Sequence, residues 1–403
     1  MKLADCVDLL AGFAFKSQYF TNRPDDIPLV KGENVSQGGI LWEISKRWSA
    51  ADWSNLEKYQ LRSGDVVVAM DRPWVPAGLK WAYIRSDDPK ALLVQRCSRL
   101  RSNTPKLDQD FLRFVIGGPG FESYVMPITT GVNVPHISGS QILDYEFALP
   151  PLPVQQRIAG ILSAYDELIE NSRRRIKILE AMARALYREW FVHFRFPDHE
   201  NHPRVASPLG EIPQGWEVKK LGDIAENFDR MRKPLSKMQR SQLQGEYPYY
   251  GAAKVFDYVN GYIFDGEYLL LAEDGSVITP ERAPVLQLVN EKFWPNNHTH
   301  VLRGKSPFST HFLYLGLSEV DISPYITGAA QPKITQENMN RIPFFCGPEY
   351  LHIEFNLLVE PTIRQSHILQ RQVQNLRRTR DLLLPRLLSG QIDVSNQPEP
   401  VPA

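Results

Sequence analysis

Loops that combine basic, amide and aromatic residues are the feature of this chain with the clearest chemical potential. Arginine and lysine can pair with guanine edges or phosphates, and asparagine and glutamine can pair with adenine. In the first half the candidate DNA-binding residues are Lys31, Asn34, Arg47, Arg72, Trp74, Asn133 and His136. In the second half they are Arg230, Arg232, Lys233, Tyr249, Lys254, Asn296, Gln331 and Lys333. Each residue alone is typical of an ordinary solvated surface, so their recurrence in both halves is what favours nucleic-acid binding.

Motifs of common catalytic sites are absent from the sequence. It contains no Walker loop, no GxGxxG after a strand, no GxSxG elbow, no HExxH and no Asn-Pro-Pro-Tyr-like methyltransferase signature. One nuclease-like pattern is present, formed by Asp198, Glu217 and Lys219. Such a site needs carboxylates on adjoining strands around a magnesium ion, whereas Asp198 lies in a segment rich in proline and histidine. We therefore expect the pattern to be coincidental and the chain to contain no catalytic residue.

The candidates for metal or phosphate binding favour structural roles instead. His298 and His300 alternate along an expected strand and would share one face, but no third ligand is evident, so packing or hydrogen bonding is favoured. The segment Gly117–Gly120 could cradle a phosphate, yet Pro119 removes an amide donor, which favours a plain turn. We therefore predict neither a metal nor a cofactor.

Composition limits the class of protein further. The 403 residues are enough for two or three domains. The 46 basic and 46 acidic residues cancel, which excludes a uniformly basic nucleic-acid-binding protein but allows local basic patches. Cys6, Cys97 and Cys346 are far apart and lack zinc-ligand spacing, as is typical of a reducing compartment. No apolar run reaches transmembrane length, so we expect a cytoplasmic protein without membrane contact.

The elements that must position these loops are repeated along the chain. Residues 127–191 align without a gap on residues 324–388, at an offset of 197 positions. The ten identical positions in the first copy are Pro127, Thr130, Gly131, Pro135, Ile137, Phe147, Pro151, Arg174, Leu179 and Leu186. An internal duplication of this size predicts a pseudo-twofold molecule that binds in two equivalent places.

Each copy ends in a long segment whose apolar residues alternate at spacings of four and three, the a/d seam of a coiled coil. In the first copy the seam consists of Ile158, Leu162, Tyr165, Ile169, Ile176, Leu179 and Leu186. In the second copy it consists of Leu369, Val373, Leu376, Leu383 and Leu387, and it also carries Arg380. A single amphipathic helix usually packs on its own domain, but two matched helices of this length favour pairing with each other.

An antiparallel pair is the simplest closure of these two helices. Roughly 40 residues at a rise of 1.5 Å per residue give a rod about 60 Å long. Pro361 is expected to kink or restart the second helix, because proline lacks an amide proton and clashes with the preceding turn. Gly390 is a natural end for it.

The remaining patterns divide the chain into mixed, strand-rich domains and connecting segments. Predicted strands are Val66–Met70 and Glu267–Leu271, the latter after a turn at Asp265–Gly266, and helices are expected near 52–59 and 108–116. The predicted boundaries are 1–150 for the first domain, 151–196 for the first long helix, 197–214 for a linker, 215–347 for the second domain, 348–392 for the second long helix and 393–403 for a disordered tail.

Several motifs, taken in order, resemble the specificity subunit of a type I restriction–modification system over essentially the whole chain. In the first copy they are Gly12–Ser17, Val30–Asn34, Gly64–Val67 and Pro150–Ile158. Further on they are Gly210–Trp216, Leu221–Asp223 and Leu382–Gly390. The second copy departs from the family pattern at Phe344–Tyr350, which lacks the Leu-Pro-Pro-Leu-Pro and Gln-Gln run and leaves the start of the second helix open.

This resemblance implies an α+β fold with two target-recognition domains in pseudo-twofold arrangement, separated by an antiparallel coiled coil of two long helices. It further implies that the chain is not an enzyme, that it reads a bipartite, asymmetric sequence in double-stranded DNA, and that two methyltransferase subunits and restriction (translocase) subunits are its partners. A stiff helical pair suits this role, because two half-sites must be held at a fixed distance and phase.

Two alternatives remain open from the residues alone. One is a coiled-coil scaffold without a DNA role, and the other, with only the Asp198 pattern in its favour, is a self-contained nuclease or methyltransferase. The apolar segment Trp190–Phe194 and the helix surfaces are candidates for methyltransferase docking, since exposed apolar area usually marks an interface. Packing of this segment against the chain's own domains is equally compatible with its composition.

Overall fold

The computed structural model describes residues 1–75, 77–129, 135–328 and 331–395. The chain forms two compact units. Unit 1 comprises Met1–Asn171 together with the described residues from Gln372 onward, and unit 2 comprises Ser172–Arg371. Both units combine sheets with helices, so the predicted α+β class is confirmed.

Unit 1 is built on two sheets of short strands. The five-stranded sheet has the order β1 (Val7–Ala11), β11 (Cys97–Ser102), β6 (Val66–Ala69), β9 (Trp81–Tyr83) and β3 (Gln37–Gly38). The four-stranded sheet has the order β4 (Arg47–Trp48), β2 (Ile27–Val30), β10 (Ala91–Leu93) and β5 (Gln60–Leu61). A separate pair consists of β7 (Trp74–Val75) and β8 (Gly78–Leu79). The predicted strand at β6 is confirmed, and it is buried over its whole length between two neighbours.

The helices of unit 1 are α1 (Gln109–Ile116), α2 (Pro119–Ile128), α3 (Gly139–Leu143) and a 3₁₀ segment at Ala50–Tyr59. The predicted helices near 52–59 and 108–116 are thus present, the first in 3₁₀ form. The expected plain turn at Gly117–Gly120 is wrong in part, because Gly118 is the N-cap of α2 and Pro119 is its first helical residue. Proline is favoured there, since the first helical amide has no partner within the helix.

Unit 2 contains one six-stranded sheet and two strand pairs. The sheet order is β15 (Ala225–Asn227), β20 (Thr299–Gly304), β18 (Phe264–Ala272), β19 (Leu286–Pro295), β16 (Gln244–Tyr250) and β17 (Val255–Val259). The pairs are β12 (Arg204–Ser207) with β13 (Gly210–Pro213) and β14 (Glu217–Lys220) with β21 (Pro343–Cys346). The short helices are α5 (Leu221–Ile224), α6 (Lys237–Gln242), α7 (Thr310–Leu317) and α8 (Gln336–Asn340). Asp265 and Gly266 lie within β18, so the expected turn before this strand is wrong.

The sequence repeat corresponds to repeated structure. Helices α3 and α8 differ by the offset of 197 positions, and their N-caps Ser138 and Thr335 both accept a hydrogen bond from the helix. Ile137 and Ile334, which precede these caps, are completely buried. The two units are therefore copies of one supersecondary pattern.

The two long helices are α4 (Leu152–Tyr187), which continues as a π-turn at Arg188–Val192, and α9 (Glu349–Leu388). Helix α9 begins at Glu349 and runs through Pro361, so the expected restart at this proline is wrong. Pro361 is exposed, and solvent there can satisfy the carbonyl that loses its amide partner. Gly390, just beyond the end of α9, has a φ of 74°, as expected for a helix stop. None of the helices among the described residues is long and apolar enough to cross a membrane.

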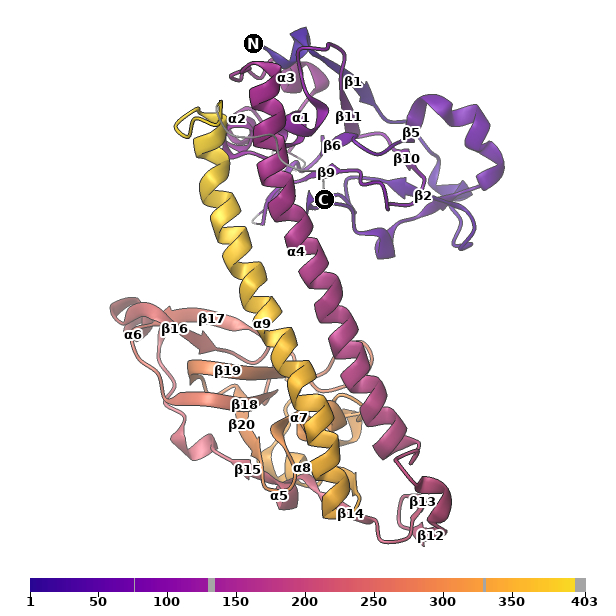
Figure 1. Cartoon of the computed structure of the whole chain (residues 1–403), viewed down its shortest axis with the longest axis vertical. Helices are drawn as coiled ribbons and strands as arrows, with labels where there is room; N and C mark the ends of the chain where they lie inside the picture. The colour runs from indigo at the N-terminus through magenta and orange to yellow at the C-terminus, as the bar shows by residue number, and fades with distance from the viewer. Residues whose placement is uncertain (76, 130–134, 329–330, 396–403) are drawn as a thin grey trace. The chain divides into compact units, whose positions relative to one another are not determined.

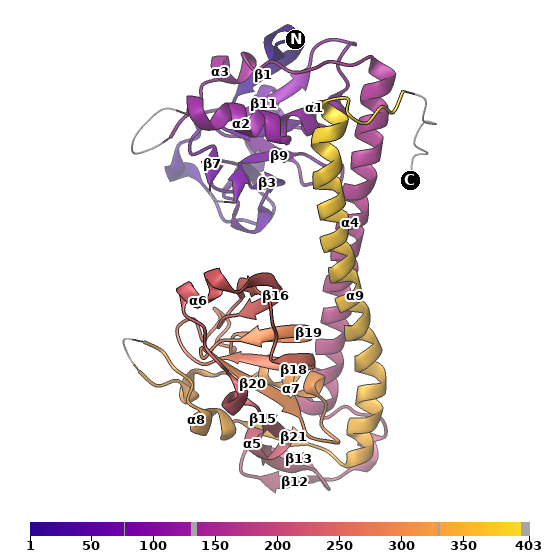
Figure 2. The same cartoon turned by 90° about the vertical axis from the view of Figure 1, so that its left-hand side faces the viewer.

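Within each unit, α4 and α9 lie side by side and run antiparallel (Figures 1 and 2). In unit 1, Arg380 of α9 pairs with Asp166 of α4 at 2.6 Å, which neutralises the charge in the seam. In unit 2, Glu180 of α4 accepts hydrogen bonds from Ser366 and Gln370 of α9. The seam residues that are buried are Ile158, Leu162, Ile169, Leu369, Val373 and Leu387. Those that are half-buried are Tyr165, Ile176, Leu179, Leu186, Leu376 and Leu383.

The seam residues also belong to the cores of the two units. The main core of unit 1 joins Ile158 and Leu162 of α4 and Leu387 of α9 to residues of α1, α2 and the large sheet. The core of unit 2 joins Phe355 and Val359 of α9 to residues of α7 and β18. The helices are therefore integral parts of both folded units, not a separate rod.

The apolar segment Trp190–Phe194 is part of the core of unit 2. The side chains of Trp190, Phe191 and Phe194 are 6%, 1% and 7% exposed, and they pack with Trp216 and Phe355. The interpretation of this segment as a docking surface is therefore wrong, because its three large aromatic side chains are already covered and only Val192, at 43% exposure, presents apolar area.

Two of the predicted irregular segments are partly ordered. Residues 197–214 contain the hairpin β12–β13, from which Ile212 packs into the core of unit 2, so the segment is not a plain linker. At the C-terminus, Val394 is 4% exposed in the core of unit 1, and Arg157 donates to the Ser395 carbonyl at 2.8 Å. The predicted disordered tail therefore starts too early, and its residues 396–403 lie outside the described ones.

His352 of α9 predicts a pH dependence of stability. It is 1% exposed among Phe191, Phe308 and Phe312, and this burial lowers its pKa from 6.5 to about 4, with the Gly347 backbone acting in the opposite direction. Below pH 6.5 the unfolded chain binds a proton that the folded chain rejects until about pH 4. Stability is therefore expected to fall by roughly 3 kcal/mol as the pH falls through this window.

Denaturant unfolding at a series of pH values between 7 and 4 measures this effect. The variant His352→Phe should lose the corresponding part of the slope, whereas His193→Phe, at an exposed histidine, should keep the wild-type slope. An unchanged slope in His352→Phe would assign the acid sensitivity to other groups.

Candidate nucleic-acid interface

In unit 1, three segments meet where strand β6 ends. The carboxylate of Asp71 pairs with Arg96 at 2.8 Å and with Nδ1 of His136 at 2.7 Å. Asp71 and His136 also form a backbone bridge. The predicted residue His136 is thus brought next to the Arg72 loop, although 65 positions separate it from Asp71.

Arg72 and Trp74 lie on this loop and are both exposed. Trp74 donates from its indole nitrogen to Glu122 at 2.7 Å, which fixes the orientation of its ring. In Figure 2, β7, which begins two residues after Arg72, lies on the side of unit 1 opposite to α4 and α9. The loop is therefore on a face that the long helices leave uncovered.

Two lysines from different segments adjoin the same site: Lys31 follows β2, and Lys80 lies between β8 and β9. The carbonyl of Gly32 accepts a hydrogen bond from Nζ of Lys80, and burial lowers the pKa of Lys80. Lys31 pairs with Glu33 at 2.8 Å and lies 5.3 Å from the centroid of the Phe20 ring. Lys31 and Lys80 add positive charge beside the Arg72 loop.

Two predicted residues of unit 1 have structural partners instead. The side-chain amide of Asn34 is buried, donates to Leu29 and Ser45, and accepts from the Lys31 amide. Arg47 donates to the carbonyls of two loop residues, at 2.9 and 2.7 Å. Both side chains hold loops in shape. Asn133 lies outside the described residues.

In unit 2, the equivalent strand end carries a larger ionic cluster. Glu273 pairs with Arg232 at 2.7 Å and with Lys333 at 3.0 Å. Burial opposes ionisation of Glu273, but the hydrogen bonds from Arg232 and Lys333 prevail and lower its pKa. Asp229 pairs with His300 at 2.6 Å and also approaches Arg232 at 3.5 Å. Two of the predicted basic residues, Arg232 and Lys333, are thus brought together by the half-buried carboxylate of Glu273.

This cluster has the composition of a metal site but the bonding of an ionic network. Ligand atoms of Asp229, Glu273 and His300 lie within 4.8 Å of one another. However, Arg232 and Lys333 already supply positive charge, and Nε2 of His300 lies 2.9 Å from the Ile334 carbonyl. The ionisable atoms therefore have partners, and a cation would have to displace two basic side chains.

The two histidines of the expected alternating strand differ in position. His298 precedes β20 in a turn and pairs with Asp274 at 2.6 Å, whereas His300 is in the strand and buried. Both histidines form hydrogen bonds, as expected. The expectation that both lie in one strand is wrong, because only His300 does. The residues of the nuclease-like pattern make separate contacts. Glu217 pairs with Lys219, and Asp198 accepts a hydrogen bond from Asn201.

The other predicted residues of unit 2 fall into two groups. Asn296 and Tyr249 are buried: Asn296 accepts from the His298 amide at 2.8 Å, and the Tyr249 hydroxyl accepts from the Leu235 amide at 3.0 Å. These two residues support the loops around the cluster. The exposed members are Arg230, Lys233, Lys254 and Gln331.

The predicted DNA-binding residues omit two residues of these sites: Arg96, and His298, for which the sequence favours only packing or hydrogen bonding. Each directly precedes the strand that pairs with the central strand, and each binds an aspartate, Asp71 or Asp274. The backbone pattern is the same, since Arg96 accepts from the Met70 amide and His298 from the Glu273 amide. The two residue types differ, so only the pairing of strands reveals the correspondence.

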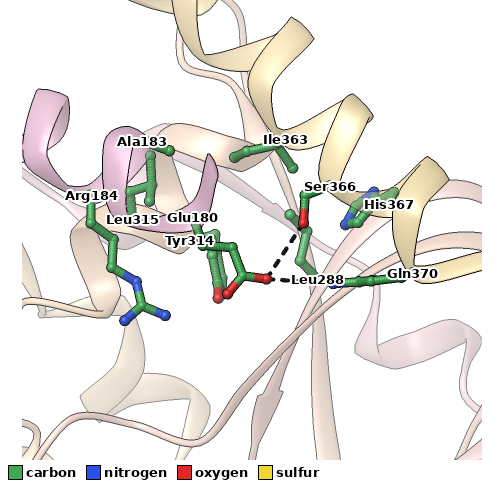
Figure 3. A pocket seen from close by; sticks show the side chains of 10 residues that line it. All are labelled: Glu180, Ala183, Arg184, Leu288, Tyr314, Leu315, Ile363, Ser366, His367 and Gln370. Atoms are coloured by element: carbon green, nitrogen blue, oxygen red, sulfur yellow. Dashed lines mark hydrogen bonds between the residues drawn. The ribbon is translucent and has the colours of Figure 1, made fainter. Parts of the chain in front are cut away.

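A cavity of about 160 Å³ lies in unit 2 between α4, α9 and the sheet (Figure 3). Its lining residues are Glu180, Ala183, Arg184, Leu288, Tyr314, Leu315, Ile363, Ser366, His367 and Gln370. The Glu180 carboxylate points toward Ser366 and Gln370 and accepts hydrogen bonds from both, at 3.5 and 3.4 Å. The cavity marks a place where small seam residues leave the two helices loosely packed.

Known proteins with related sequences are specificity subunits of type I restriction enzymes. The family model of the type I restriction modification DNA specificity domain matches residues 1–181 and 213–345. The MjaIX specificity subunit of a type I restriction enzyme from Methanocaldococcus jannaschii is 26% identical over 301 residues, which cover 71% of this chain and 69% of the relative. The EcoAI specificity subunit from Escherichia coli is 31% identical over 173 residues, 43% of this chain and 28% of the relative.

Other alignments cover nearly the full length of this chain and of the relative. The HindI specificity subunit from Haemophilus influenzae is 19% identical, with 93% of this chain and 95% of the relative aligned. The crystal structure of a type I restriction-modification S subunit from M. genitalium superposes with a TM-score of 0.63 at 16% identity, covering 98% of this chain and 96% of that one. The similarity to this crystal structure shows a shared fold.

Proposed function

The chain belongs to the family of type I restriction–modification DNA specificity domains, and from this membership we propose that it selects a bipartite DNA target, each half of which is read by one unit. It is a specificity subunit and not an enzyme, so methylation and cleavage are carried out by other subunits. The strand-end loops are the proposed contacts: Arg72 and Trp74 with Lys31 in unit 1, and Lys333 with the exposed basic residues in unit 2.

The observation that carries this proposal is the repetition of one basic strand end in both units. In each unit an acidic residue after the central strand holds basic or imidazole side chains, and the backbone bridges Asp71–His136 and Asp274–Lys333 are equivalent. Two such sites on related but different loops suit a split, asymmetric target. A scaffold without a DNA role offers no reason for this repetition.

Base-resolution mapping of methylated adenines tests the proposal. The chain is expressed with its methyltransferase subunit in a host without other adenine methylation. We expect methylation at one bipartite sequence with a fixed gap, and its loss when the chain is omitted. Methylation that is unchanged without the chain, or that follows a single continuous motif, would refute the proposed function.

We propose that an exposed apolar stripe on the first half of α9 receives a methyltransferase subunit. Tyr350, Ile353, Leu357 and Leu358 are 47%, 49%, 70% and 54% exposed in unit 2. Tyr350, Ile353 and Leu357 are spaced by three and four residues and form one helical stripe, which Leu358 widens on one side. Such a stripe on a soluble surface is typical of a protein interface. Two methyltransferase subunits and restriction (translocase) subunits complete the proposed assembly.

The variant Leu357→Glu is expected to weaken methyltransferase binding at least tenfold, because a charge would be buried at the interface. Co-purification and titration by light scattering measure the loss, and the melting temperature of the isolated chain should stay within about 2 °C of the wild type, since an exposed substitution changes stability little. Met238→Glu is the matched control, because Met238 is also 70% exposed but lies on α6. Equal binding of both variants would place the interface elsewhere.

A further inference from the structure

The end of the central strand has the same backbone pattern in both units, and this pattern identifies equivalent residues. In unit 1 the Arg72 amide donates to the Pro135 carbonyl at 2.6 Å. In unit 2 the Gly275 amide donates to the Pro332 carbonyl at 3.1 Å. Pro135 and Pro332 are also aligned by the sequence repeat, so Arg72 and Gly275 occupy the same position.

This shared position requires a left-handed backbone. The φ angle is 45° at Arg72 and 78° at Gly275. Glycine adopts this conformation freely, whereas any residue with a Cβ atom is strained there. Strained positions of this kind persist where the surrounding structure fixes them, and they cluster at functional sites. Unit 1 therefore tolerates strain at a point where unit 2 uses glycine.

The guanidinium of Arg72 receives no compensation from the described part of the chain. The side chain is exposed and forms neither a hydrogen bond nor an ion pair there. Two other arginines with positive φ differ in this respect: Arg96 pairs with Asp71 at 2.8 Å, and Arg282 pairs with Asp321 at 3.0 Å. Among the described residues, none offsets the strain at Arg72 by binding its side chain.

The surroundings of Arg72 favour a planar partner that offers hydrogen-bond acceptors. The carboxylate of Asp71, the nearest acidic group in the sequence, is already engaged by Arg96 and His136. The loop is fixed on its other side by the hydrogen bond from the Lys80 amide to the Pro73 carbonyl at 2.7 Å. Arg72 thus has a fixed backbone, and its exposed guanidinium has no partner within the described part of the chain.

We propose that Arg72 reads a guanine in the first half-site, donating two hydrogen bonds from its guanidinium to O6 and N7 in the major groove. This inference rests on the proposed function of the chain. A planar guanidinium fork on a fixed backbone matches the two acceptors of the guanine edge. Gly275 lacks a side chain, so unit 2 reads its half-site from other positions.

The full chain assembled with its methyltransferase provides the test. Methylation rates are measured on the mapped target and on targets with each base pair of the first half-site replaced. Arg72→Gly should lower the rate on the natural target by roughly 10- to 100-fold and abolish discrimination at one G·C pair. Discrimination in the second half-site should be unchanged, and Arg72→Lys should not restore the lost discrimination.

Thermal unfolding and a matched variant separate recognition from folding. The melting temperature of Arg72→Gly should equal or exceed that of the wild type, because glycine relieves the strain. Arg282→Gly relieves the same backbone strain in unit 2 and should leave discrimination in the first half-site intact. A lower melting temperature for Arg72→Gly would contradict the strained assignment.

Two outcomes would overturn the proposal for Arg72. The first is full discrimination at every pair of the first half-site in Arg72→Gly. The second is a loss that is uniform across sequences, is rescued by Arg72→Lys and reduces the salt dependence of binding, since this pattern identifies a phosphate contact. A wild-type complex that methylates no bipartite target would instead refute the proposed function, so the two failures are distinguishable.

Discussion

Insertion of seven residues into both long helices is expected to lengthen the gap between the two half-sites by about three base pairs. Seven helical residues add about 10.5 Å, which corresponds to about three steps of 3.4 Å along DNA. The insertions belong after Asn171 in α4 and after Arg371 in α9, where each helix passes from one unit to the other. Seven residues are two helical turns of the a/d pattern, so the apolar seam keeps its register.

Mapping of methylated adenines measures the result directly. The natural target should lose its methylation, and a target with the longer gap but the same half-site sequences should gain it. As a control, the same seven residues inserted between Ser207 and Gly210, in the turn of the β12–β13 hairpin, should leave the gap unchanged. Altered half-site sequences at a constant gap would show that the helices do not set the spacing.

Replacement of Arg232 with alanine is expected to destabilise unit 2 by about 3 kcal/mol, because it leaves half-buried carboxylates without their main cation. The Arg232 side chain is 15% exposed, and it donates to Glu273 and to the Thr299 carbonyl, each at 2.7 Å. Lys333 remains as a partner of Glu273 but loses its fixed surroundings. Discrimination in the second half-site should therefore also weaken, while the first half-site is read normally.

Denaturant unfolding and methylation of targets altered in one half-site measure the two effects of this variant. Arg303→Ala is the matched control in the same unit, since its pair with Glu226 is 47% and 44% exposed. Such an exposed pair contributes about 0–1 kcal/mol. If Arg232→Ala is as stable as Arg303→Ala, the ionic cluster is not important for folding.

Strong local patterns predicted many of the elements. The apolar run at Val66–Ala69 became a buried strand, and the heptad positions of α4 and α9 became the faces on which these helices pack. The segment 197–214 was misjudged because proline, glycine and histidine are typical of linkers, whereas β12 and β13 are stabilised by pairing and by the burial of Ile212. Pro361 was misjudged because helix α9 is held by tertiary packing of Phe355, Val359 and Ile363 on both sides of it.

The candidate site was less predictable than the fold. Asn34 and Arg47 have the residue types of DNA contacts, yet their polar atoms are engaged by nearby loop groups. Arg72 has the same residue type as Arg47, and its side chain forms no such bond with any described residue. In the sequence, Asn34, Arg47 and Arg72 are all polar residues in predicted loops and cannot be told apart. Only the folded backbone distinguishes a side chain that holds a loop from one that is exposed.

The sequence by itself determined the duplication, the two long helices, the lack of recognisable catalytic motifs and the family resemblance, because these depend on residue order, periodicity and spacing. The tertiary structure alone decided which basic residues gather at the strand ends. Hydrogen bonds between strands place Arg96 beside Asp71 and Lys333 beside Glu273, and a left-handed backbone turns Arg72 outward. Pairing between distant strands sets these positions, and no local pattern in the chain records that pairing.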